Sequence, residues 1–200
     1  MIAFALAVFF MISTPGPAVL ALAGVGATFS FRDGINFLIG LTIGYLIVWL
    51  LIVTGLASVF FSYFYIRVIF AAISSLYLVY LASKICFSGS KIAFTDSYRI
   101  PSIKDGIILQ IVNPKAYAFH SILLSGFSIF PNNLLIEIII KFILMNLIWL
   151  PLHLAWLFIG SSFRKINLKP KFRNYINLFM GCSLIVVSIL SFLSIYDMKH

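Results

Sequence analysis

A proline-glycine motif interrupts the first apolar stretch of the chain. The motif, TPGP at residues 14–17, lies within residues 2–31, which contain no Asp, Glu, Lys, Arg or His. Proline lacks the N–H that an interior helical turn needs, and glycine adds backbone entropy, so the motif predicts a broken helix. Its second half would begin near Ala18 with unpaired N–H groups, which favour a carboxylate. The carbonyls of Ser13 and Thr14 lose their partners to the prolines and could accept hydrogen bonds from an ammonium group.

A second break is predicted at "IVNPKAYAF", residues 111–119. Pro114 pushes Asn113 away from helical geometry. Lys115 follows inside an apolar run, where a lysine costs about 2.5–3.5 kcal/mol to insert, so we expect it to face a polar cavity. The alternative is a lysine whose stem reaches toward the membrane surface. Both breaks, with Gln110 one turn before the second, supply the candidate substrate-binding residues: Thr14, Pro15, Gly16, Pro17, Gln110, Asn113, Pro114 and Lys115.

Three further side chains are candidates for coupling transport to protons: His120, Glu137 and His153. Histidine titrates near neutrality, although a buried, hydrogen-bonded histidine is the commoner arrangement. Glu137 and Lys141 are spaced i,i+4, which favours an ion pair near the end of a span over a proton relay. Neither an HExxH metal motif nor a serine-protease turn is present, so we expect no metal, no cofactor and no enzymatic activity.

The elements that must position these residues are membrane-spanning helices. Mean hydropathy is +1.13, and 10% of the residues are charged, against about 25% in typical soluble domains. The apolar runs are continuous, which favours helices over a barrel. The expected fold is therefore all-α, one transmembrane domain over residues 1–200 with six spans at about 2–30, 35–62, 68–87, 106–130, 134–160 and 174–196. A cleaved signal peptide at the start is an alternative, disfavoured because no Lys or Arg precedes Arg32.

The two breaks suggest an internal repeat. Each lies in the first of three spans, at a depth of about 11–18 Å in a core of about 30 Å. Because three is odd, the second triplet enters the membrane from the opposite side, as in transporters built from inverted repeats. Discontinuous first and fourth helices would then meet near mid-depth. The alternative is a pair of proline kinks accommodated by neighbouring helices.

The distribution of the 14 Lys and Arg residues predicts the orientation. The first, third and fifth loops hold most of them, so these loops are expected on the cytoplasmic side and both termini on the outer, periplasmic side. Basic loops beside spans are the ordinary case in membrane proteins, so they do not indicate nucleic-acid binding. Gly40 and Gly44 have the GxxxG spacing that lets helices pack closely, within one subunit or in a homodimer.

Several segments resemble the LysE/RhtB family of amino-acid exporters. They are "TPGPAVLALAGVGATFSFRDGINFLIGLTIG" at 14–44, "LYLVYLASK" at 76–84 and "GIILQIVNPKAYAF" at 106–119, which include the family's TPGP and NPKA signatures. The last third of the chain matches only as a pattern of spans. The chain departs from the family at Ala18, where members usually carry Asn or Asp, and at residues 125–127, where they often carry Pro-Gln-Phe.

This resemblance implies export of amino acids or close derivatives across the bacterial inner membrane, driven by an ion gradient such as the proton-motive force. The expected partners are a small amino-acid substrate and the lipid bilayer. The departure at Ala18 leaves the particular amino acid open. The alternative functions are those of a membrane-embedded subunit or a thiol-handling membrane protein, although Cys86 and Cys182 lack CxxC spacing.

Overall fold

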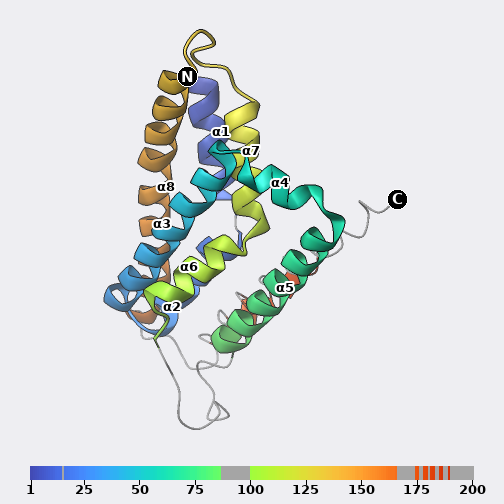
Figure 1. Cartoon of the computed structure of the whole chain (residues 1–200). Helices are drawn as coiled ribbons and strands as arrows, with labels where there is room; N and C mark the ends of the chain where they lie inside the picture. Colours follow the sequence, from blue (N-terminus) through green and yellow to red (C-terminus); the bar gives the residue numbers. More distant parts are fainter. Residues whose placement is uncertain are drawn as a thin grey trace.

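The computed structural model describes residues 1–14, 16–86 and 100–165, and isolated positions between residues 174 and 189. Pro15 and most of the span predicted at 174–196 lie outside the described residues. Within residues 1–165 the described chain forms helices and no strand (Figure 1). These helices are α1 (Ile2–Ser13), α2 (Pro17–Thr28), α3 (Phe31–Val53), α4 (Leu56–Ser62), α5 (Phe64–Cys86), α6 (Ile103–Ile111), α7 (Pro114–Ser125) and α8 (Leu134–Lys165).

The chain is interrupted at both proline motifs. α1 and α2 meet at an angle of 53°, and α6 and α7 at 61°. Pro17 and Pro114 each occupy the first helical turn of the second helix, where the missing N–H costs no hydrogen bond. Asn113 caps α7, because its side-chain oxygen accepts a hydrogen bond from the backbone N–H of Lys115 at 3.1 Å. The two breaks therefore come from proline geometry, as the sequence predicts.

Two of the described helices are long and apolar enough to cross a membrane, α3 and α8, and the number rises to four if each bent pair counts as one span. The segment 35–62 is divided, because α3 ends at Val53 and Gly55 adopts a φ of 76° before α4 begins. This left-handed conformation suits glycine. The six-span count and the inverted repeat remain predictions.

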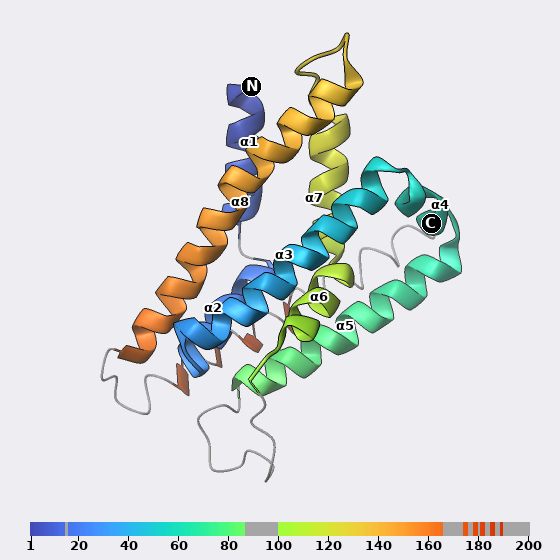
Figure 2. The same ribbon diagram turned by 60° about the vertical axis from the view of Figure 1, so that its left-hand side comes forward.

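The lower half of the bundle in Figure 1 is closely packed, with α6 crossing α3 and α2 lying along α8, as the turned view in Figure 2 also shows. A Cβ on Gly40 would fall on the carbonyl of Ile103, and one on Gly160 on the carbonyl of Ala23. Such contacts leave room only for glycine. The predicted packing role of Gly40 is thus confirmed, and it lies within the subunit.

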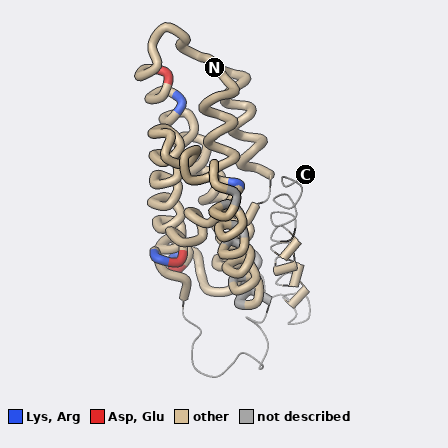
Figure 3. Tube along the Cα trace, turned by 45° about the vertical axis from the view of Figure 1, so that its right-hand side comes forward, with Lys and Arg blue, Asp and Glu red and all other residues tan. Residues whose placement is uncertain are grey.

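In the described part of the chain, charged residues gather near the two ends of the bundle, and a further basic segment lies at mid-height between them (Figure 3). Arg32 and Asp33 lie in the first turn of α3, which Ser30 caps by accepting a hydrogen bond from the N–H of Asp33 at 3.1 Å. This arrangement suits a helical bundle with apolar flanks inside a bilayer.

Candidate substrate site at the two helix breaks

The two breaks are joined by one hydrogen bond. The ammonium of Lys115, in the first turn of α7, donates to the carbonyl oxygen of Thr14 at 2.5 Å, although 101 positions separate the residues in sequence. Thr14 follows the last residue of α1, and its hydroxyl donates to the carbonyl of Phe10 at 2.8 Å. The Thr14 carbonyl is thus an acceptor at the break that a cation already occupies.

Gly16 gives Lys115 the space to reach Thr14. A Cβ at Gly16 would stand 2.7 Å from Cδ and 3.2 Å from Nζ of Lys115. The φ of Gly16 is −139°, extended backbone that other residues also adopt, so the requirement at this position is space. The lysine stem therefore lies directly against the break between α1 and α2.

A cavity of about 50 Å³ adjoins this contact. It has room for a few water molecules and is much smaller than the roughly 300–1,000 Å³ of typical small-molecule pockets. Its walls come from both broken pairs and from α3 and α8: Met11, Ile12, Gly16, Ala18, Val19, Tyr45, Gln110, Asn113, Lys115, Ala116, Phe119, Trp149 and His153. An amino acid would therefore enter only if the Lys115 side chain or the helices moved.

Two oxygen atoms at this cavity lack a partner among the described residues. Oε1 of Gln110 and the hydroxyl of Tyr45 are both buried, and each residue lines the cavity. A buried polar group without a hydrogen bond costs about 1–3 kcal/mol. Both oxygens are therefore available to water or to a polar ligand.

The start of α2 is the better anion site of the two half-helices. No side chain caps α2, and Ala18 and Val19 of its first turn line the cavity. The start of α7 is instead capped by Asn113. A helix N-terminus favours negative charge, so α2 offers backbone N–H groups to a carboxylate next to the ammonium of Lys115.

The structure thus brings together five of the predicted site residues at one cavity: Gly16, Gln110, Asn113, Lys115 and His153. Thr14 does not line the cavity, but its carbonyl oxygen accepts the hydrogen bond from Lys115. Pro17 and Pro114 shape the breaks without lining the cavity. Sequence reasoning did not identify Tyr45 and Trp149, because an aromatic residue inside an apolar run gives no signal that separates a site from a core.

The two histidines occupy different surroundings. His153 lines the cavity, stacks on Trp149 with ring centroids 3.7 Å apart, and has Nδ1 2.9 Å from the Trp149 carbonyl oxygen. His120 is fully buried outside the cavity lining, with its ring centroid 4.6 Å from that of Tyr45. Neither ring nitrogen of His120 has a hydrogen-bond partner among the described residues.

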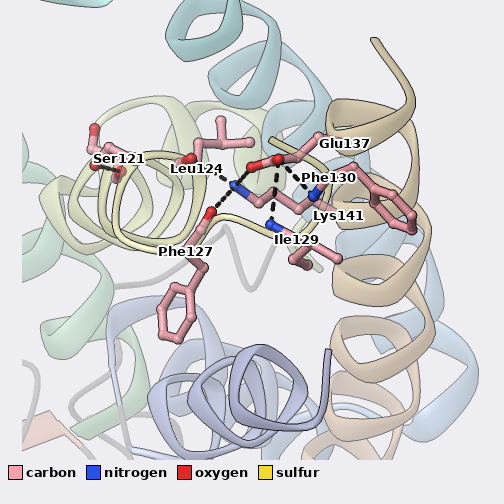
Figure 4. A network of polar contacts seen from close by, with 8 residues as sticks. Ser121, Leu124, Phe127, Ile129, Phe130, Glu137 and Lys141 are labelled. Atoms are coloured by element: carbon pink, nitrogen blue, oxygen red, sulfur yellow. Dashed lines mark hydrogen bonds and ion pairs between the residues drawn. The ribbon is translucent and has the colours of Figure 1, made fainter. Parts of the chain in front are cut away.

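Glu137 does not line the cavity but forms the ion pair expected from its spacing, with Oε1 2.6 Å from the ammonium of Lys141. Figure 4 shows the surrounding network, in which Lys141 also donates to the carbonyls of Leu124 and Phe127. Oε2 of Glu137 accepts from the backbone N–H of Phe130 at 2.9 Å. The pair therefore fastens the loop after α7 to α8.

Apolar helices with two breaks and a polar site between them define a membrane transport protein. Residues 9–194 match the family model of the LysE type translocator. The chain belongs to this family, so it is a transporter and not an enzyme, and the predicted resemblance is confirmed. The family exports amino acids or related compounds. No curated protein sequence and no solved protein structure matches this chain.

Proposed function

We propose that this protein exports amino acids or close derivatives from the bacterial cytoplasm and binds them between the two helix breaks. The observation that carries the proposal is the hydrogen bond from the Lys115 ammonium to the carbonyl of Thr14. In this bond the acceptor at one break is paired with a primary ammonium group, which supports a site for a substrate ammonium. An amino acid carries such a group together with a carboxylate.

Binding would proceed by exchange of ammonium groups. The substrate ammonium replaces that of Lys115 on the Thr14 carbonyl, and the released Lys115 pairs with the substrate carboxylate beside the N-terminus of α2. Hydrogen bonds between charged partners are the strong ones, so the exchange replaces each lost contact with one of similar strength. Gln110 and Tyr45 offer further oxygen atoms to the bound molecule.

Export then requires the site to face each side of the membrane in turn. We propose one transmembrane domain of six spans in two inverted repeats, in the inner membrane, with both termini outside and the basic loops in the cytoplasm. The proton-motive force is the proposed driving force. His153 at the cavity and buried His120 are the candidate proton carriers, whereas Glu137 is held in its ion pair. A homodimer is compatible with these features.

Efflux from whole cells tests the proposal. Cells loaded with amino acids by dipeptide feeding would be compared with and without the protein, and with Lys115→Ala and Gly16→Leu at equal membrane levels. Lys104→Ala is the matched control, because Lys104 is an exposed lysine at the start of α6. We expect cells with the intact protein or with Lys104→Ala to lose some amino acids faster than cells without the protein. Lys115→Ala and Gly16→Leu should abolish this difference. Unchanged loss of every amino acid would contradict it.

A further inference from the structure

A second and larger cavity lies beyond the central one, between α3, α7 and α8. Its volume is about 370 Å³, within the range of small-molecule pockets. Its walls include Val53 at the end of α3, Leu124 and Ser125 at the end of α7, and Glu137 and Lys141 near the start of α8. Under the proposed orientation, these helix ends lie on the outer side of the membrane.

The three helices place the two cavities at the same separation. Eight residues separate Tyr45 from Val53 along α3, Ala116 from Leu124 along α7, and Trp149 from Lys141 along α8. Eight residues span about 12 Å of helix, and positions four apart share a helix face. The outer cavity therefore extends to about two helical turns above the central cavity along all three helices, and on α7 its wall begins at Ser121, two positions after Phe119 of the central cavity.

One residue of each helix stands midway between the cavities: Trp49, His120 and Met145. His120 and Met145 are fully buried, and the indole nitrogen of Trp49 is buried as well. None of the three lines either cavity. We call these three side chains the dividing layer, because each lies along its helix between wall residues of the two cavities.

Buried polar atoms without a hydrogen-bond partner extend from the central cavity toward the outer one. Within the described part of the chain, the buried side-chain atoms without a hydrogen-bond partner belong to Ser13, Gln110, Tyr45, Trp49 and His120. The last four run from the central cavity into the dividing layer. Because buried polar groups are normally hydrogen-bonded to protein or water, their alignment favours a path that water or a polar solute occupies.

We propose that the outer cavity is a second binding station for the exported zwitterion and that the dividing layer opens to connect it with the central site. This inference rests on the proposed transport function and adds the route of release. The wall carries the ion pair of Lys141 and Glu137, whose two charges a zwitterion would have to take over from each other on binding, and Ser121 and Ser125 line the same cavity. The remainder of the wall is apolar and suits the side chain of an apolar amino acid.

Cysteine accessibility tests this route without a measurement of transport. In a background with both native cysteines replaced, Cys86→Ser and Cys182→Ser, the outer cavity is probed with Ser125→Cys. The matched control is Ile122→Cys on the same helix, because Ile122 is 51% exposed on the outside of the described bundle and does not line the cavity. A membrane-impermeant thiosulfonate is added outside intact cells.

We expect Ser125→Cys to react from outside and Ile122→Cys to stay unreactive, because a lipid-facing thiol does not ionise. External addition of the proteinogenic amino acids as a mixture should slow the reaction of Ser125→Cys at least about twofold, the effect of half occupancy. Labelling from the cytoplasmic side alone, equal labelling of both positions, or no protection by amino acids would each overturn the proposal.

The dividing layer is tested from the central cavity. Ala116 lines that cavity, so Ala116→Cys is the probe. Its reaction from outside should become at least about tenfold faster when Met145→Ala or His120→Ala removes part of the dividing layer. A tenfold change corresponds to about 1.4 kcal/mol in the cost of opening the layer. Ala82→Cys, fully buried in α5, should stay unreactive in the same backgrounds and so report intact folding. An unchanged rate at Ala116→Cys would overturn the dividing layer. Failure of efflux, with labelling and protection by amino acids as expected, would instead contradict only the proposed export.

Discussion

Lys115 and Thr14 connect the two interruptions of the helical bundle, with the lysine ammonium 2.5 Å from the threonine carbonyl oxygen. The donor belongs to the first turn of α7 and the acceptor follows the last residue of α1. One hydrogen bond thus joins two segments that are far apart in the chain.

Replacing Lys115 by Met keeps an unbranched stem and removes the ammonium. Because a hydrogen bond to a charged group contributes about 1.5–3 kcal/mol, the rate of amino-acid efflux should fall about 10- to 150-fold. Lys115→Arg keeps the charge but is bulkier beside Gly16, so an intermediate rate is expected. Initial efflux rates at equal membrane levels measure both. Normal transport by Lys115→Met would remove the ammonium from the mechanism.

Gly16→Ala should impair transport through Lys115 rather than through the backbone. The added Cβ would stand 2.7 Å from Cδ of Lys115, and the atoms nearest to it all belong to that side chain. The substitution should therefore have little further effect once Lys115→Ala is present. A double-mutant cycle on efflux rates should give a coupling of at least about 0.5 kcal/mol. Additive effects of the two substitutions would show that Gly16 acts independently of Lys115.

Gly40→Leu should destabilise the bundle itself. The leucine side chain would overlap sterically with the backbone of Ile103 at the crossing of α3 and α6. Backbone atoms cannot move aside as a flexible side chain does. Overpacking of this kind costs about 1–3 kcal/mol or more, so the thermal unfolding midpoint in detergent should drop. Ile39→Leu, at a neighbouring position that is 43% exposed, is the control and should leave the midpoint unchanged. Equal midpoints for both variants would contradict the close packing.

Lys141→Met should lower stability more than Lys141→Met combined with Glu137→Gln. The single substitution leaves the Glu137 carboxylate without its ion pair and the Leu124 carbonyl without its donor. Removing one partner leaves the other charge unpaired, which is more destabilising than removing both, so the second substitution restores part of the loss. Thermal unfolding of the intact protein and both variants in detergent measures the order. Lys141→Met unfolding at the same temperature as the intact protein would contradict the fastening role of the pair.

The helix breaks were predictable because proline and glycine inside an apolar run contradict a continuous helix on local grounds alone. The nearness of Gln110, Asn113 and Lys115 was predictable for the same reason, since they follow one another around a single break. The ion pair of Glu137 and Lys141 was readable from i,i+4 spacing. Each of these features depends on a short segment of chain.

The features that depend on several helices were not predictable. The Lys115–Thr14 bond requires the relative placement of α1 and α7, which no local pattern encodes. Tyr45 and Trp149 reach the cavity from α3 and α8, yet their sequence neighbours are ordinary apolar residues. The end of α3 at Val53 depends on the conformation of Gly55, a single small residue within an apolar stretch.

The most direct test of substrate binding between the breaks is amino-acid counterflow in liposomes that contain the purified protein, because counterflow needs no proton gradient. Vesicles loaded with one unlabelled amino acid would be diluted into a trace of its labelled form. The proposed site predicts that the intact protein and Lys104→Ala accumulate label transiently. It predicts that Lys115→Met accumulates none. Accumulation that persists in Lys115→Met, or is missing from the intact protein for every amino acid, would contradict it.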